Sequence, residues 1–321
     1  MKRGILCSGY GAQYAGMGKD LYDDHRVVQE YFEEASDCSG INFVKLCFAS
    51  SDAELAQINH AALVLYLWGA ASSALLRHDA IAVDSVAGCD IASWYSALHS
   101  VGAVTFPDGL YILRKWGELY AAYSEQSTQS FITISSSDIA VRRMLETVCN
   151  DMQSKEMFVR ISYITPNIVT VIGTREELDV YVHTVQQRDH ALNIEHHRAY
   201  ESPVVFLPED MIAQLLHYLE KIDFHEPQRP VASPLINEWL TTQESLKATA
   251  RELFSQPFRV DLVMRSLRSF EEIICAVPSL KTRSHYTVWL PQCKLWVMDT
   301  KEELRAMSDS LAEKREEEVP T

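Results

Sequence analysis

Residues 129–198 carry the pattern that most constrains the fold, because predicted strands and helices alternate there in one specific order. The predicted elements are a strand at 131–134, a helix at 137–151, β-branched strands at 156–163 and 168–173, a helix at 175–187 and a strand at 191–197. The order β-α-β-β-α-β is typical of a ferredoxin-like module. We therefore expect a ferredoxin-like subdomain at 129–198, inserted into a larger domain that comprises 1–128 and 199–310 and precedes a charged tail at 311–321.

The flanking segments predict an α/β architecture for the larger domain. A short apolar strand at 5–7 leads into a loop of small residues, and a strand at 81–87 leads directly into a helix. The other predicted elements are helices at 60–77, 208–222, 238–254 and 258–270, a helix that ends near 123, a strand at 272–277, a hairpin-like stretch at 286–298 and a helix at 301–318. A chain of 321 residues is long enough for such a domain together with a smaller insert.

The net charge argues against one class of partner. The chain has 44 acidic and 29 basic side chains, which give a formal net charge of −15 at pH 7. Nucleic-acid binders normally present a basic face, and the same acidic balance weakens any general attraction to anionic membranes or acidic carrier proteins. We therefore expect no nucleic-acid partner and no membrane partner.

Cysteine usage and hydropathy predict a cytoplasmic protein. The seven cysteines are odd in number and form no CxxC pair, which favours reduced, mostly buried thiols and predicts no metal site. The apolar run at 61–76 is shorter than a membrane helix requires and contains two serines, so it predicts a buried helix. The apolar stretch at the start ends at once in Ser-Gly, unlike a signal peptide. No cofactor is expected.

The segment 88–98 reads Gly-Cys-Asp-Ile-Ala-Ser-Trp-Tyr-Ser-Ala-Leu and lies between a predicted strand and a predicted helix. It resembles the nucleophile elbow of the malonyl-CoA:acyl carrier protein transacylases, which reads Gly-His-Ser-Leu-Gly-Glu-Tyr-Ser-Ala-Leu. Further segments resemble that family in the same order, namely 16–22, 32–36, 46–48, 102–110, 199–203 and 256–259. The resemblance thus extends to about residue 281. It implies an α/β-hydrolase-like large domain with a parallel sheet and an inserted ferredoxin-like subdomain.

The resemblance also implies a two-step acyl transfer in which a serine attacks the thioester of malonyl-CoA. In this chain the serine position reads Asp90, or Ile91 if the one extra residue is placed directly after Gly88, and the preceding histidine reads Cys89. A carboxylate that attacked a thioester would form a mixed anhydride, which is less stable than the ester. Cys89 and Ser93 remain as possible substitute nucleophiles, although a cysteine at such a turn is usually a buried side chain.

The other side-chain roles that the resemblance implies are also altered. The base position reads Glu201 instead of histidine, and a glutamate is a poor base for a serine hydroxyl. The arginine that would hold the malonyl carboxylate reads Trp116, and the glutamine that would orient the histidine reads Arg259. The oxyanion-binding groups are backbone N–H groups, so Tyr10 and Ile91 could still supply them.

If the fold is retained, three of the altered positions, Asp90, Glu201 and Arg259, lie at one cleft. Buried carboxylates without a cation are costly, so we expect Arg259 to pair with Asp90, with Glu201, or with both. The alternative is that all three side chains point into solvent from an open or collapsed cleft.

These changes favour a malonyl-CoA:acyl carrier protein transacylase-like protein that has lost acyl transfer. Its role would be binding, scaffolding or regulation in acyl-carrier, fatty-acid or polyketide metabolism, with an acyl carrier protein or a CoA thioester as partner. Two alternatives stay open. One is an active acyltransferase or thioester hydrolase with a rebuilt site, and the other is an unrelated α/β protein, which would lack the insert.

Overall fold

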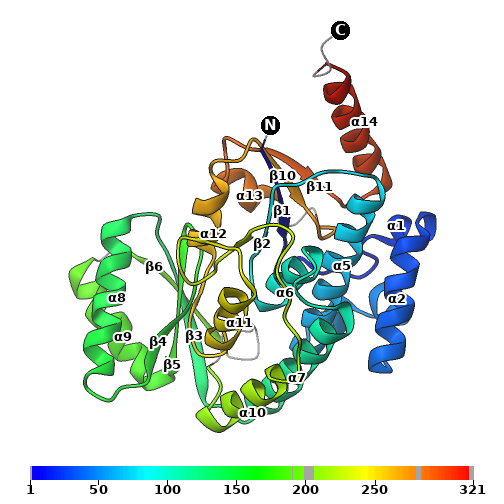
Figure 1. Ribbon diagram of the computed structural model, residues 1–321. Helices are drawn as coiled ribbons and strands as arrows, with labels where there is room; N and C mark the ends of the chain where they lie inside the picture. Colours follow the sequence, from blue (N-terminus) through cyan, green and yellow to red (C-terminus); the bar gives the residue numbers. More distant parts are fainter. Residues whose placement is uncertain (1, 190, 199–205, 280–282, 318–321) are drawn as a thin grey trace.

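The computed structural model describes residues 2–189, 191–198, 206–279 and 283–317. These residues form two sheets with helices packed around them, and the predicted α/β fold class is confirmed (Figure 1). The helices are α1 Lys19–Asp24, α2 Arg26–Ser39, α3 Phe43–Ala49, α4 Asp52–Leu55, α5 Ile58–His78, α6 Ile91–Ser100, α7 Phe106–Ser124, α8 Ile139–Gln153, α9 Arg175–Arg188, α10 Glu209–Leu219, α11 Gln243–Glu252, α12 Val260–Leu267, α13 Arg283–Trp289 and α14 Lys301–Glu317.

The larger sheet is mostly parallel and has the strand order β11-β10-β1-β2-β7-β8. Its strands are β1 Arg3–Cys7, β2 Ser85–Gly88, β7 Val231–Ala232, β8 Trp239–Leu240, β10 Glu272–Cys275 and β11 Lys294–Val297. Strand β1 lies between β10 and β2, and only β8 runs antiparallel to its neighbour. The central strands are buried almost completely, as expected for a parallel sheet that helices cover on both faces.

Helix α5 is the core helix of the larger domain. It is long and apolar enough to cross a membrane by length and composition alone, and it is the only such helix among the described residues. Its side chains from Ala61 to Leu76 are nevertheless buried inside the protein, where they contact α2, α6 and α7. The prediction of a buried helix is therefore confirmed.

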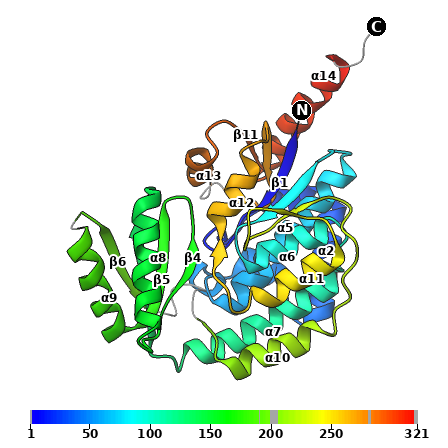
Figure 2. The same ribbon diagram turned by 60° about the vertical axis from the view of Figure 1, so that its left-hand side comes forward.

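The second sheet consists of the four strands of the predicted βαββαβ module and one additional strand. Its order is β6-β3-β5-β4-β9, with the bounds β3 Gln129–Ser135, β4 Val159–Ile164, β5 Ile168–Thr174, β6 Asn193–Arg198 and β9 Phe258–Arg259. Helices α8 and α9 pack together against this sheet (Figure 2). Strand β9 comes from much later in the chain and pairs in parallel with β4, so that Tyr163 lies opposite Phe258. The two halves of the protein are thus joined by main-chain hydrogen bonds as well as by side-chain packing.

The predicted hairpin at 286–298 is wrong. The structure forms helix α13 followed by the single strand β11, which runs parallel to β10. Two parallel neighbours cannot be joined by a tight turn and need a crossover, which α13 supplies. Helix α13 packs against the protein through Tyr286, and Leu290 directly after it is also buried, whereas the β-branched Val288 is 71% exposed.

The pH dependence of stability should reflect His99 at the end of α6. Its Nδ1 donates to the Val104 carbonyl, and its Nε2 accepts from the Tyr31 hydroxyl. Burial lowers the pKa of His99 from 6.5 to about 4. Between these two values the unfolded chain holds a proton that the native protein does not, so stability falls as the pH falls through this window. We expect His99 to account for a loss of about 3 kcal/mol on going from above pH 6.5 to below pH 4.

Urea unfolding at a series of pH values measures this slope. In His99→Gln the slope should flatten, whereas His78→Gln, at a side chain that is 70% exposed, should leave it unchanged. Equal slopes in the wild type and His99→Gln would contradict the assignment.

Candidate functional site

The candidate site lies where two parallel neighbours, β1 and β2, end at the same edge of the larger sheet. Cys7 and Gly88 are paired in register, so the loops that follow them emerge side by side. This edge is where ligands bind in open α/β sheets. The loop after β1 brings Tyr10 to the turn that contains Asp90, the position where sequence comparison predicts a nucleophile.

Neutral donors hold the Asp90 carboxylate. Its Oδ2 accepts from the Tyr10 backbone N–H at 2.5 Å, and its Oδ1 accepts from the Ser93 N–H and hydroxyl, each at 2.8 Å. Burial raises the pKa of Asp90 above its ordinary value, while the hydrogen bonds from Ser93 and Tyr10 oppose that rise. A Cβ on Gly9 would lie 2.7 Å from Oδ2, so only glycine allows this close approach. The backbone N–H that was predicted to bind an oxyanion is therefore bonded to the protein's own carboxylate.

The backbone of the turn is relaxed. Asp90 is extended, with φ −154° and ψ −175°, and serves as the N-cap of α6. Among the described residues other than glycine, only Ala80 and Glu156 have positive φ, so neither Asp90 nor Ile91 does. A nucleophile elbow presents its serine on a sharp, strained turn between strand and helix. Here the same position is an ordinary helix cap.

Ser93 is part of this cap and faces away from solvent. Its hydroxyl oxygen accepts from the backbone N–H groups of Cys89 at 2.8 Å and Asp90 at 2.9 Å, which completes a capping box. The side chain is fully buried. The sequence offered Ser93 as a substitute nucleophile, and the structure gives its hydroxyl a structural role instead.

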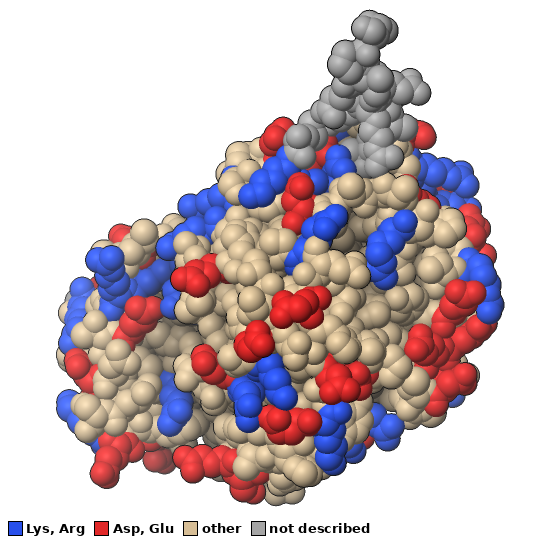
Figure 3. All heavy atoms as spheres, in the orientation of Figure 1, with Lys and Arg blue, Asp and Glu red and all other residues tan. Residues whose placement is uncertain are grey.

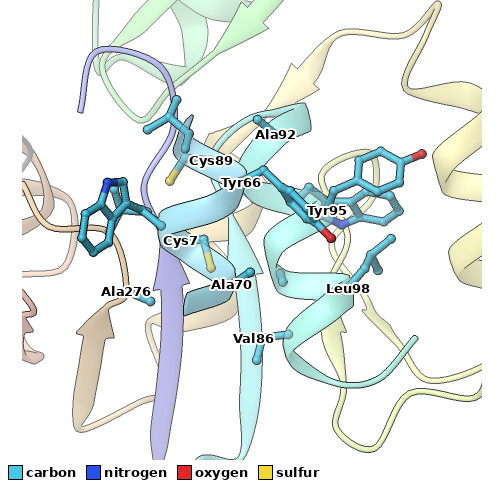
Figure 4. Close-up of a cluster of buried hydrophobic side chains, with 14 of the residues drawn as sticks. Cys7, Tyr66, Ala70, Val86, Cys89, Ala92, Tyr95, Leu98 and Ala276 are labelled. Atoms are coloured by element: carbon cyan, nitrogen blue, oxygen red, sulfur yellow. The ribbon is translucent and has the colours of Figure 1, made fainter. Parts of the chain in front are cut away.

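Cys89, the other possible substitute, belongs to the core. Its side chain is 4% exposed and lies in the buried cluster that also contains Cys7 (Figure 4). Sγ is 3.5 Å from the Tyr286 hydroxyl, and burial raises the pKa of the Cys89 thiol to about 12. At neutral pH the group is a thiol, whereas the thiolate is the nucleophilic form.

A cavity of about 160 Å³ lies beside Asp90. Its described walls come from the loop after β1, α5, the first turn of α6, α7, strand β4, the segment before α10, and strand β9 with the segment before it. The residues that line it are mainly aromatic and aliphatic: Tyr10, Ile58, Ala62, Leu65, Asp90, Ile91, Ala92, Trp116, Tyr120, Ser162, Tyr163, Phe206, Leu207, Leu253, Phe254, Gln256 and Phe258. Asp90 is the one charged side chain among them.

Trp116 makes one wall of this cavity apolar at the predicted carboxylate-binding position. The side chain is 7% exposed, and its ring packs against Tyr120 with centroids 5.2 Å apart. The neighbouring cations do not compensate, because Arg114 and Lys115 both bond to the exposed Glu118. An anionic group entering the cavity would thus meet no described cation on this helix.

Ser162 is a cavity residue that sequence analysis did not identify. The register of β4 against β5 shifts between Ile161 and Tyr163, so Ser162 is the extra residue of a β-bulge. The Ser162 hydroxyl is buried and finds no hydrogen-bond partner among the described residues. The Tyr163 hydroxyl donates to the Cys89 carbonyl at 2.8 Å, which fastens β4 to the turn. A bulge leaves no signal in the local sequence, because it depends on the register of the partner strand.

Arg259 does not pair with Asp90 in the described structure. Its guanidinium bonds to Asp261 at 2.9 and 3.0 Å and lies 3.8 Å from Glu146. These partners raise the pKa of Arg259, chiefly through the Asp261 hydrogen bonds. Arg259 is therefore not the partner of Asp90. The other predicted partner, Glu201, lies outside the described residues. Nor do any three His, Cys, Asp or Glu side chains gather as a metal site would require, within the part of the chain that is described.

Comparison with known proteins supports the fold described above. A sequence model of the family described as "Acyl transferase domain" matches residues 5–276. The malonyl CoA-acyl carrier protein transacylase of Bacillus subtilis is 23% identical over 280 residues, which cover 85% of this chain and 86% of that protein. The crystal structure of the malonyl-CoA:acyl carrier protein transacylase from Helicobacter pylori superposes with a TM-score of 0.81 at 18% identity, over 98% of this chain and 99% of that one.

A second solved structure is a type II polyketide synthase acyl-carrier protein in complex with its malonyl-transacylase. It superposes with a TM-score of 0.83 at 18% identity, and the match covers 97% of this chain and 100% of that one. At these identities the two superpositions establish the fold alone.

Proposed function

The chain belongs to the acyl transferase family, and we propose that it is a catalytically degenerate member that binds a ligand in the family's cleft without transferring an acyl group. The observation that carries this proposal is the hydrogen bond from the Tyr10 N–H to the Asp90 carboxylate. Asp90 is an acid at the position where acyl transfer needs an alcohol. The hydrogen bond to Asp90 also occupies the Tyr10 N–H, a donor that would otherwise stabilise the oxyanion.

The surroundings support the same conclusion. The relaxed turn presents no side chain in the manner of an elbow, Ser93 is bonded within the cap and Cys89 is a buried thiol. An active acyltransferase or thioester hydrolase with a rebuilt site is the alternative. It would have to free one of these two groups by breaking the N-terminus of α6.

The proposed partners follow from the fold and from the relatives. One solved relative is a complex of an acyl carrier protein with its malonyl-transacylase, so we propose an acyl carrier protein or a CoA thioester as the partner here. The visible face of the protein mixes basic and acidic side chains and shows no single field of one charge (Figure 3). We further propose a cytoplasmic location, based on the cysteine usage.

Covalent labelling tests the loss of acyl transfer. The protein is incubated with malonyl-CoA and with acetyl-CoA, quenched in acid and weighed intact by mass spectrometry. We expect no acyl adduct under conditions in which the Bacillus subtilis transacylase, run in parallel, is fully acylated. A slow background reaction at exposed groups is recognised by peptide mapping, because Cys38 is exposed while Cys89 is not.

The variants Ser93→Ala and Cys89→Ala make the result specific. An adduct on the wild type that disappears in either variant would establish the active alternative and overturn the proposal. An adduct at Asp90 itself, detected as a mass increase on the peptide that contains it, would do the same.

A further inference from the structure

Aromatic rings surround the cavity beside Asp90 on more than one side. Trp116 and Tyr120 form one pair on α7, with ring centroids 5.2 Å apart. Tyr163 and Phe258 form a second, stacked pair, with centroids 6.3 Å apart, on the adjoining strands β4 and β9. All four residues line the cavity. The negative face of an aromatic ring attracts a cation, and several rings around one space are a known arrangement for binding quaternary ammonium groups.

The cavity also contains an anionic group that no described cation neutralises. The donors that reach the Asp90 carboxylate are all neutral: they are the backbone N–H groups of Tyr10, Ala92 and Ser93 and the Ser93 hydroxyl. No Lys, Arg or His is among the described lining residues, and Arg259 pairs with Asp261 instead. Burial raises the pKa of Asp90, whereas its hydrogen bonds and the N-terminus of α6 favour the ionised form of this carboxylate. A buried charge without a counter-charge is costly in free energy. A cationic ligand beside the Asp90 carboxylate would reduce this cost.

The size of the cavity limits the ligand. Its volume is about 160 Å³, close to that of an engineered cavity of roughly 150 Å³ that holds one benzene molecule. A trimethylammonium or short alkylammonium group fits such a space, whereas a long acyl chain would have to extend out of it. The unpartnered Ser162 hydroxyl adds a single neutral donor and acceptor on the wall formed by β4.

We infer that this cavity binds a small ammonium group, held between the Asp90 carboxylate and the rings of Trp116, Tyr120, Tyr163 and Phe258. The inference deepens the proposed binding function and rests on it, since it names the chemical class of ligand for the same cleft. It requires no bond to be made or broken. The charge preference is opposite to that of a site that selects a carboxylate, because the charged side chain among the described lining residues is a carboxylate and several of the others are aromatic.

Choline and its neutral carbon isostere, in which a quaternary carbon replaces the quaternary nitrogen, separate charge from shape. Both are titrated into the full-length protein by calorimetry, and contact with the aromatic residues is followed by saturation-transfer NMR. We expect choline to bind at least about tenfold more tightly than the isostere, because both share the same volume and only one carries a charge. Tighter binding of the isostere, equal binding of the two, or no binding of either would overturn the inference.

Two variants and one control locate the site. Asp90→Asn keeps a residue that can cap α6 and should abolish the preference for choline while the isostere still binds, which also shows that the cavity is intact. Trp116→Leu should weaken choline more than the isostere. The control Asp151→Asn changes the net charge equally at an exposed position on α8 and should leave both affinities unchanged.

An unchanged choline preference in Asp90→Asn would place the binding elsewhere and overturn the inference. The labelling experiment is independent of these titrations. An acyl adduct would contradict the proposed loss of acyl transfer but would not change the measured preference for choline. A failed choline titration would contradict the ammonium site but would not change the result of the labelling experiment.

Discussion

Gly88→Ala is expected to lower the free energy of unfolding by about 4 kcal/mol or more, or to prevent folding altogether. A Cβ on Gly88 would lie 2.4 Å from the Trp94 nitrogen and 2.5 Å from both the Ser93 carbonyl carbon and the Trp94 Cα. All three are main-chain atoms of α6, so no flexible side chain can yield. Strand β2 is fixed in turn by its pairing with β1, and the methyl group could be accommodated only if the strand and the helix moved apart.

Gly4→Ala is the matched control, because Gly4 also lies on a buried strand. A Cβ there would meet the Ile273 and Phe270 side chains at 3.3 Å, which can shift slightly. Urea unfolding of both variants, followed by circular dichroism, gives the comparison. A loss in Gly88→Ala no larger than the loss in Gly4→Ala would contradict the close contact between β2 and α6.

Arg3→Met is expected to cost about 3–5 kcal/mol, because it removes the cation from a buried ion pair. The Arg3 guanidinium bonds to Glu272 Oε2 through two nitrogens at 2.9 and 2.7 Å. The Glu272 side chain is only 2% exposed, and the pair joins β1 to β10 in the centre of the larger sheet. Without this arginine, the Glu272 carboxylate stays buried without its ion-pair partner or must take up a proton.

Two further variants distinguish this cost from a general effect of losing an arginine. Arg26→Met breaks exposed ion pairs to Glu30 and Glu33 and should change stability by less than about 0.5 kcal/mol. In the double variant Arg3→Met with Glu272→Met both charges are gone, and most of the lost stability should return. If Arg3→Met alone lowered the free energy of unfolding no more than Arg26→Met does, the expected contribution of the buried ion pair would be contradicted.

The order of elements could be predicted from the sequence wherever local pattern decides the structure. The βαββαβ order, the buried helix α5 and the strand-to-helix turn at Asp90 depend on periodicity and on short apolar runs, and each is present. The stretch 286–298 could not be predicted in this way. Its β-branched and aromatic residues suit a strand, but the crossover between β10 and β11 requires a helix there.

In the candidate site, too, some features could be predicted from the sequence and others depend on tertiary contacts. The resemblance indicated which positions lie in the cleft, and the structure brings Tyr10, Asp90 and Trp116 together there. The partner of Arg259 was missed because Asp261, two residues further along the chain, competes for the guanidinium at no loop-closure cost. The bulge at Ser162 depends on the register between two strands and has no local signature.

Strand β9 has a practical consequence for work on separate parts of the protein. A fragment limited to 129–198 would lack Phe258 and Arg259, so the outer edge of β4 would lose its pairing at Tyr163 and Ile164. Such a fragment is expected to self-associate through that edge even if its own four strands and two helices form correctly. A proline on the outer edge of β4 would be the way to keep it monomeric.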